Sequence, residues 1–524
     1  MNNMKVIINK KLFWIFCAAL AIGVYQMFVV FSISGDGPVY IDAARRFYEG
    51  DFATALRKEF PPLYPVLIAI AYTISPNWIV AGKAVSLVLG FLTIFPVYFL
   101  VKKVFGEKLA LITALLLVFH PFVCKYWVRV LTEGTYIFLL ACSVWLSWKA
   151  ITEKKYVLFF LSGVAAGLNY LNRPEGIGVF IITALFVVCG SPLIKKGSYK
   201  KRFLSLCALS AGIIILAGPY IMYMKSVTGK WQLSRKKNVA VALMGKPGES
   251  SSVPAPELDA KARIPAYSKL ETGYFKTLFD ISKLFVNVYY PSLFILMLIG
   301  FIRRKIYYYD LRFELYIGVL CIFYILVFSL FYASDRHLVP LVSICLFWAS
   351  IGLYELNDVV LNIWHKVNKT EMLSDKRVFG FLLVGIIITL LPFTLRPQDR
   401  DKIGQKRVGK WMKENCKKSP FILTDMGRIA FYANGYFVQL QNRPDIDTYE
   451  KLVAFATRPN EGSYGYNSGH NKCSVDYIVI DKSRIGRYCP DFLDSVNPLT
   501  LDIVHVQPKL SHSAYGELVV YKVK

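Results

Sequence analysis

The chain has 524 residues, of which 55% are hydrophobic and 15% are aromatic. This composition excludes a soluble protein of that length and predicts a polytopic α-helical membrane protein. The formal net charge of +27 comes largely from Lys and Arg in short loops, which are typical of the cytoplasmic side. We interpret the charge as topology and attraction to anionic lipid, and we expect no nucleic-acid partner.

The first apolar segment runs from Phe13 to Phe31 and is long enough to cross about 30 Å of hydrocarbon. It leads directly to Asp36, which therefore lies near the headgroups. Pro38 predicts the start of a helix, and apolar residues through Phe52 alternate with charged ones at helical spacing. This pattern predicts a helix lying in the interface, followed by an apolar segment at 63–75 that is too short to cross. Residues 33–80 form the expected first external loop.

Further apolar segments separated by basic loops predict about eleven transmembrane helices, with the N-terminus inside. The spans after the first are expected near 81–100, 109–123, 132–150, 156–171, 177–194, 203–224, 284–302, 313–331, 338–354 and 378–395. Residues 225–282 are rich in Pro, Ser and Gly and predict a long mobile external loop. The expected transmembrane domain is therefore 1–395.

Residues 396–524 differ in character and predict a small external α/β domain. Five short β-type runs occur there, and the first three are interleaved with helical patterns at 404–416, 428–433 and 449–456. The runs are FILTD, VQL, DYIVID, LDIVHV and ELVVYKV. Cys416, Cys473 and Cys489 allow one disulfide, whose pairing the sequence leaves open.

Ionisable residues near the ends of several spans are the main chemical signal, because charge at membrane depth is costly and marks function. All are expected on the external side, and they are Lys125, Arg129, Glu133, Arg173, Glu175, Asp335, Arg336 and His337. A structural interpretation remains open for several of them. Arg173 with Glu175 would make an interfacial ion pair, Arg129 an anchor, and Lys125 a structural contact.

The expected first external loop carries Asp36 just after the first span, and Glu59, Pro61, Pro62 and Tyr64 further along. With these residues the loop resembles that of lipid-linked-sugar glycosyltransferases with the GT-C fold. The closest likeness is to relatives of dolichyl-phosphate-mannose protein mannosyltransferase and of aminoarabinose transferase. LTEGTYIFL, LNRPEG and RHLVP resemble external-edge elements of the same enzymes.

The resemblance implies a catalytic role for Asp36, as the general base. It implies substrate-binding roles for Glu59, Tyr64, Glu133, Arg173, Glu175, Arg336 and His337. Asp36 would accept the proton of the acceptor hydroxyl, while cations stabilise the charge left on the phosphate. An N-cap role for Asp36 is the structural alternative.

Two positions depart from the family pattern. Phe60 precedes Pro61 where aminoarabinose transferases have a phosphate-binding lysine, and His337 stands where a tyrosine is commoner. We expect Arg336 or Arg173 to contact the phosphate instead. No cofactor is expected to be required, and a divalent Mg or Mn ion held by Asp36 or Glu59 is the competing solution.

The expected function is transfer of a sugar from a polyprenyl-phosphate donor to a hydroxyl of a protein or glycolipid acceptor, with inversion, on the periplasmic or extracellular side of the plasma membrane. An O-antigen ligase or polymerase is the nearest alternative class. A secondary transporter fits less well, because its ionisable groups should lie near mid-membrane in repeated halves.

Overall fold

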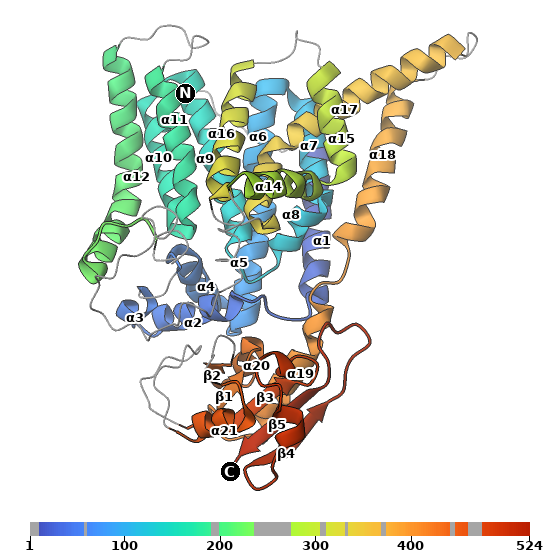
Figure 1. Ribbon diagram of the computed structural model, residues 1–524. Helices are drawn as coiled ribbons and strands as arrows, with labels where there is room; N and C mark the ends of the chain where they lie inside the picture. Colours follow the sequence, from blue (N-terminus) through green and yellow to red (C-terminus); the bar gives the residue numbers. More distant parts are fainter. Residues whose placement is uncertain are drawn as a thin grey trace. The chain divides into compact units, whose positions relative to one another are not determined.

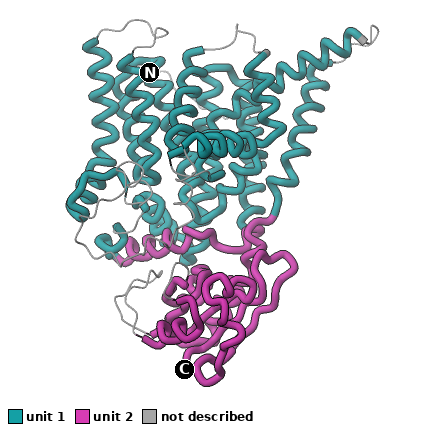
Figure 2. Tube along the Cα trace, viewed as in Figure 1, with its two compact units in different colours: residues 1–27, 50–247, 269–396 teal, residues 28–49, 248–268, 397–524 magenta. Residues whose placement is uncertain are grey.

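The structure is a computed structural model that describes residues 10–56, 60–189, 199–234, 274–303, 311–330, 334–367, 374–440, 446–458 and 474–524. The chain forms two compact units (Figure 2). The second unit includes Phe28–Glu49 and Pro397–Lys524. The described residues before Phe28, and those from Gly50 to Arg396, form the first unit. Part of the expected first external loop is thus grouped with the C-terminal region.

The first unit is helical (Figure 1). Its helices are α1 (Lys10–Val29, whose last two residues fall in the second unit), α3 (Phe52–Leu56), α4 (Leu63–Ile74), α5 (Trp78–Leu92), α6 (Ile94–Phe105), α7 (Glu107–Phe119), α8 (Pro121–Trp127), α9 (Glu133–Glu153), α10 (Tyr156–Asn172), α11 (Ile177–Cys189), α12 (Tyr199–Thr228), α14 (Tyr274–Tyr289), α15 (Pro291–Arg303), α16 (Leu311–Ser329), α17 (Asp335–Val367) and α18 (Asp375–Thr394).

The lengths of these helices confirm a multi-span membrane protein. In the described part of the chain, 7 helices are long and apolar enough to cross a membrane, or 9 if each of two bent helix pairs forms one span. The expected count of eleven is not confirmed, although the described residues of each expected segment are mostly helical. Tyr156–Asn172 and Pro174–Cys189 are apolar but short. Leu63–Ile74 is also short, in agreement with the prediction for that segment.

Proline explains both bends. The α7–α8 pair bends by 66° at His120 and Pro121, and the α14–α15 pair bends by 100° before Pro291. Proline lacks the N–H that would continue the preceding helix. The imidazole Nδ1 of His120 accepts a hydrogen bond of 3.3 Å from the Val123 N–H, so the new helix starts with a cap.

Two glycines allow α10 and α12 to pack with their backbones in contact. A Cβ atom at Gly163 would lie 2.1 Å from the Leu209 carbonyl oxygen, and one at Gly212 would lie 2.2 Å from that of Phe160. Small residues at such crossings are how membrane helices approach closely. In Figure 1, α10 lies between α9 and α12.

The expected loop at 225–282 is shorter than predicted at both ends. Helix α12 continues to Thr228, and α14 begins at Tyr274. The start of α14 carries Phe275 and Phe279 on its exposed surface, together with Lys276. The amphipathic pattern YFKTLFDISKLF therefore belongs to a helix, which the sequence analysis placed in the loop. The remainder of that loop lies outside the described residues.

The second unit contains a five-stranded sheet that confirms all five expected strands. They are β1 (Phe421–Thr424), β2 (Tyr436–Gln439), β3 (Tyr477–Asp481), β4 (Leu501–Gln507) and β5 (Leu518–Val523), in the order β2-β1-β3-β5-β4. β1 pairs in parallel with β2 and β3, while β5 pairs antiparallel with β3 and β4. Every residue of β1 and β3 is buried, as expected for strands covered on both faces.

Helices cover both faces of this sheet. α19 (Ile403–Asn415) and α20 (Gly427–Tyr432) pack on one face, and α21 (Tyr449–Thr457) packs on the other. The expected helical segments of this domain are confirmed. Cys416 and Cys489 are both free thiols, so they are not paired with each other, and Cys473 lies outside the described residues.

The N-terminal part of the second unit runs beside the start of the C-terminal region. Val30 forms a parallel bridge with Gln398. The Phe31 N–H donates to the Gln398 carbonyl at 3.1 Å, and the Gln398 N–H donates to the Val29 carbonyl at 3.0 Å. Helix α2 (Gly37–Tyr48) follows. Its residues from Tyr40 to Ala44 are buried, so this half of α2 exposes no apolar stripe of the kind expected for an interfacial helix.

Candidate active site

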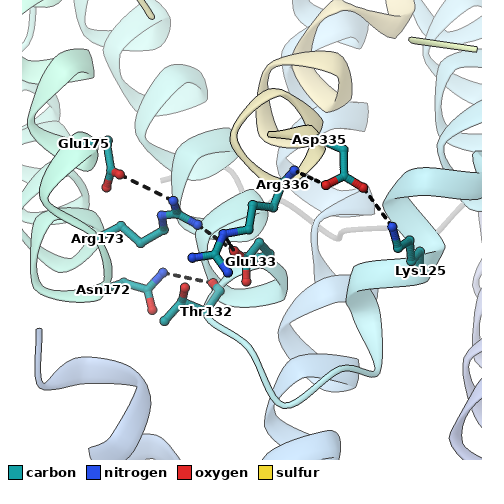
Figure 3. Close-up of polar contacts among 8 residues, drawn as sticks. All are labelled: Lys125, Thr132, Glu133, Asn172, Arg173, Glu175, Asp335 and Arg336. Carbon is teal, nitrogen blue, oxygen red and sulfur yellow. Dashed lines mark hydrogen bonds and ion pairs between the residues drawn. The ribbon is translucent and has the colours of Figure 1, made fainter. Parts of the chain in front are cut away.

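Glu133 and Arg173 form the centre of a buried charged cluster in the first unit (Figure 3). Glu133 begins α9, and Arg173 directly follows α10. Arg173 Nη1 lies 2.7 Å from Glu133 Oε1, and the two side chains are only 3% and 1% exposed. A carboxylate in the first turn of a helix is favoured by the helix dipole. The charged ends of two helices are thus tied together within the protein.

Two more charged side chains join this pair. Glu175 Oε1 lies 3.4 Å from Arg173 Nη2, and Arg336 Nε lies 3.4 Å from Glu133 Oε1. Figure 3 shows Arg336 reaching toward Glu133 from α17, across from Arg173. The structure therefore brings together Glu133, Arg173, Glu175 and Arg336, four residues that the sequence analysis selected separately.

Arg173 and Arg336 differ in how firmly they are held. Arg173 contacts two carboxylates, and its guanidinium lies 5.3 Å from the ring centre of Tyr136. Arg336 makes the longer contact to Glu133, and its side chain is 23% exposed. A ligand anion can approach Arg336 with less rearrangement, because Arg173 would have to give up a buried ion pair.

Lys125 and Asp335 fix the start of α17. Lys125 Nζ lies 2.8 Å from Asp335 Oδ2, and Asp335 Oδ1 accepts a hydrogen bond of 2.9 Å from the Arg336 N–H (Figure 3). This contact agrees with the structural role expected for Lys125. It also places the backbone of Arg336, and with it the guanidinium. Arg129 lies 5.9 Å from the ring centre of Tyr126.

Asn172 was not among the residues selected from the sequence. Its buried amide donates a hydrogen bond of 3.1 Å to the carbonyl of Thr132, which links the end of α10 to the start of α9 (Figure 3). The signal available in the sequence was its position next to Arg173 in the LNRPEG segment. Asn172 supports the geometry of the cluster by holding the two helix ends at a fixed separation.

Asp36 lies in the second unit, directly before α2. Its carbonyl oxygen accepts hydrogen bonds from the N–H groups of Val39 and Tyr40, at 3.1 and 3.2 Å. Its carboxylate makes no capping hydrogen bond to the helix. Helix capping therefore does not explain an aspartate at this position, and the structural alternative raised for Asp36 loses its basis.

The other selected residues have different surroundings. Tyr64 is fully buried, and its hydroxyl lies 2.7 Å from Ser86 Oγ and 3.1 Å from the Gly82 carbonyl oxygen. A side chain enclosed in this way packs α4 onto α5. His337 is buried and stacks on Phe328, with ring centres 5.2 Å apart. Glu59 lies outside the described residues.

A metal centre was also considered in the sequence analysis. Within the ranges that the structure describes, no group of three or more His, Cys, Asp or Glu residues could hold a metal ion. The chemistry that the described side chains offer consists of arginine cations balanced by carboxylates, and the Asp36 carboxylate.

Residues 59–223 match the model of the family described as dolichyl-phosphate-mannose-protein mannosyltransferase. This range contains Glu133, Arg173 and Glu175, but neither Asp36 nor Arg336. No curated protein matches the chain.

Solved proteins that share the fold include a bacterial ArnT and archaeal oligosaccharyltransferase structures. ArnT from Cupriavidus metallidurans, in the apo state and bound to undecaprenyl phosphate, is 12% identical with a TM-score of 0.60, and 97% of each chain is covered. The Archaeoglobus fulgidus oligosaccharyltransferase in its apo form is 12% identical with a TM-score of 0.52, covering 90% of this chain and 70% of that one. AglB from the same organism, in complex with an inhibitory peptide and a dolichol-phosphate, has a TM-score of 0.50 and the same identity and coverage. The fold is GT-C, as the resemblance implied.

Proposed function

We propose that this chain, which has the GT-C fold, is an integral-membrane glycosyltransferase that moves a sugar from a polyprenyl phosphate to a hydroxyl acceptor. The observation that carries the proposal is the family match over 59–223. The matched range supplies three members of the buried cluster, Glu133, Arg173 and Glu175, and α17 adds Arg336. The match thus includes most of this charged cluster.

The reaction is a single displacement with inversion. The acceptor oxygen attacks C1 of the sugar, the bond between C1 and the phosphate oxygen breaks, and the electron pair leaves with the polyprenyl phosphate. Asp36 takes the proton of the acceptor hydroxyl. One carboxylate suffices for this step, because no covalent sugar intermediate forms.

Arg336 is the cation that we assign to the donor phosphate. Its side chain is 23% exposed, against 3% for Arg173, and its contact with Glu133 at 3.4 Å is longer than the 2.7 Å contact of Arg173. Its contact with Glu133 can be exchanged for a phosphate oxygen while Arg173 continues to neutralise Glu133. Arg173 then holds the carboxylates in place. With Arg336 on the phosphate, no cation is needed at position 60, where this chain has Phe60.

The donor and acceptor classes are inferred from the proteins that share the fold. ArnT has been solved with undecaprenyl phosphate, and AglB with a dolichol-phosphate and a peptide. These ligands support a polyprenyl-phosphate donor and a protein acceptor. A glycolipid acceptor would also offer a hydroxyl as the attacking group. We place the active site and the C-terminal domain on the periplasmic or extracellular side, on the basis of the positive loops. Catalysis is proposed to need no metal.

The test is a comparison of donors. Protein in lipid nanodiscs is mixed with membranes of the source organism and supplied with undecaprenyl-phosphate mannose, undecaprenyl-phosphate aminoarabinose or an undecaprenyl-pyrophosphate oligosaccharide. The proposal predicts transfer of label from a monophosphate donor and release of undecaprenyl phosphate. Transfer from the pyrophosphate donor alone would indicate an O-antigen ligase or polymerase, and no transfer from any donor would contradict a glycosyltransferase.

A further inference from the structure

We propose that Arg428 and Tyr432 are positioning residues for Asp36. Both belong to α20 in the C-terminal region, and both hold the backbone of Ile33, three residues before the proposed general base. The inference rests on the proposed function, since it concerns the residue that takes the acceptor proton. It gives the C-terminal region an indirect part in the reaction, through the position of Asp36.

Both backbone polar groups of Ile33 form hydrogen bonds with side chains of α20. Arg428 Nε donates a hydrogen bond of 2.8 Å to the Ile33 carbonyl, and the Ile33 N–H donates one of 2.8 Å to the Tyr432 hydroxyl oxygen. Arg428 and Tyr432 are four residues apart on one helix, so they face the same side. Both backbone groups of one residue are thus fixed by a single helical turn.

The preceding residues are held in the same way. Lys406 Nζ donates a hydrogen bond of 2.8 Å to the Phe31 carbonyl. The Gln398 backbone bonds to Val29 and Phe31, as described above. From Val29 to Ile33 the chain is therefore attached along its length to α19, α20 and the segment before them.

A tight turn transmits this attachment to Asp36. The Gly37 N–H donates to the Ser34 carbonyl at 3.1 Å, so residues 34–37 form a closed turn with Asp36 inside it. Pro38 at the start of α2 limits the backbone further. A fixed Ile33 and a closed turn leave the backbone of Asp36 little freedom.

Arg428 and Tyr432 keep the protonation states that their hydrogen bonds to Ile33 require. Burial raises the pKa of the Tyr432 phenol above its ordinary value, so the hydroxyl stays neutral and keeps its hydrogen bonds at physiological pH. The Arg428 guanidinium is charged at every relevant pH. A Cβ atom at Gly35 would lie 3.5 Å from Arg428 Nη2, so the guanidinium lies beside the turn that carries Asp36.

The experiment measures kcat and donor KM for Arg428→Ala, Arg428→Lys and Tyr432→Phe with the donor accepted in the comparison above. Arg487→Ala and Tyr436→Phe are matched controls in the same region, and neither contacts residues 29–36. We expect kcat to fall by about ten- to a hundredfold in Arg428→Ala and by a smaller factor in Tyr432→Phe. Donor KM should change less than about threefold, Arg428→Lys should restore part of the rate, and the controls should match the wild type.

A double variant separates positioning from general stability. Adding Arg428→Ala to Asp36→Asn should cause no further loss of rate, because the arginine acts through the carboxylate. Unchanged kcat in Arg428→Ala and Tyr432→Phe, or a further loss in the double variant, would overturn the inference while Asp36→Asn alone remains inactive. Wild-type turnover in Asp36→Asn would instead contradict the proposed function.

Discussion

Arg173 Nη1 lies 2.7 Å from Glu133 Oε1, in a pair that is almost completely enclosed. Taking both charges out of water is costly, and their attraction and the added contacts to Glu175 and Arg336 offset that cost. Removing one partner leaves a buried charge with less compensation. The pair therefore couples the position of the start of α9 to that of the end of α10.

Arg173→Met is expected to destabilise the protein by about 3–5 kcal/mol, the usual cost of breaking a buried pair. The measurement is the melting temperature of the detergent-solubilised protein. Lys103→Ala is the control, because Lys103 and Glu153 form a pair at 2.7 Å with both side chains about one-third exposed, and such pairs contribute at most about 1 kcal/mol. Equal melting temperatures for the two variants would contradict a buried structural pair.

Arg336→Ala is expected to weaken donor use by about 1.5–3 kcal/mol, the typical contribution of a hydrogen bond to a charged group. Glu133 keeps its contact with Arg173 in this variant, so the fold should survive. The measurement is donor KM together with the affinity for undecaprenyl phosphate. Lys108→Ala, an exposed lysine on α7, should leave both unchanged. Normal affinity in Arg336→Ala would require another phosphate ligand.

Chelation tests the role of metal. If arginine holds the phosphate, EDTA should leave the rate of transfer unchanged, and added magnesium or manganese should not raise it. The rate is measured with metal-depleted buffers, before and after each addition. Activity that disappears with EDTA, returns with either ion and tolerates Arg336→Ala would favour a divalent ion held by carboxylates.

The sidedness of the C-terminal domain can be measured by cysteine labelling of intact cells. Leu499 is 81% exposed, so a Leu499→Cys variant should react with a membrane-impermeant maleimide if the domain is external. Lys155→Cys, at the exposed turn between α9 and α10, is predicted to be cytoplasmic and should react only after lysis. The reverse pattern would mean that the predicted orientation is inverted.

Much of the fold could be predicted because the burial of a segment determines its local pattern of apolar residues. A span is a long apolar segment, and β1 and β3 are short apolar runs because both of their faces are covered. The cluster could be predicted in part for a related reason. Glu133, Arg173 and Arg336 are ionisable residues next to apolar spans, where charge is rare unless it is paired or functional.

Contacts between distant residues could not be predicted. Arg428 and Ile33 are separated by 395 positions, and no local pattern in α20 marks this helix as a partner of the segment that follows α1. Tyr64 illustrates the opposite difficulty. A tyrosine before an apolar segment is equally typical of a substrate contact and of packing, and its hydrogen bonds to Ser86 and Gly82 cannot be predicted from local sequence.

The central claim is that Asp36 is the general base of sugar transfer, and Asp36→Asn tests it most directly. The amide keeps the shape of the side chain but cannot accept the proton. Turnover should fall by at least about a hundredfold, while the affinity for undecaprenyl phosphate and the melting temperature stay at wild-type values. Glu49→Gln, an exposed change at the end of α2, should have no effect. Near-normal turnover in Asp36→Asn would contradict the claim.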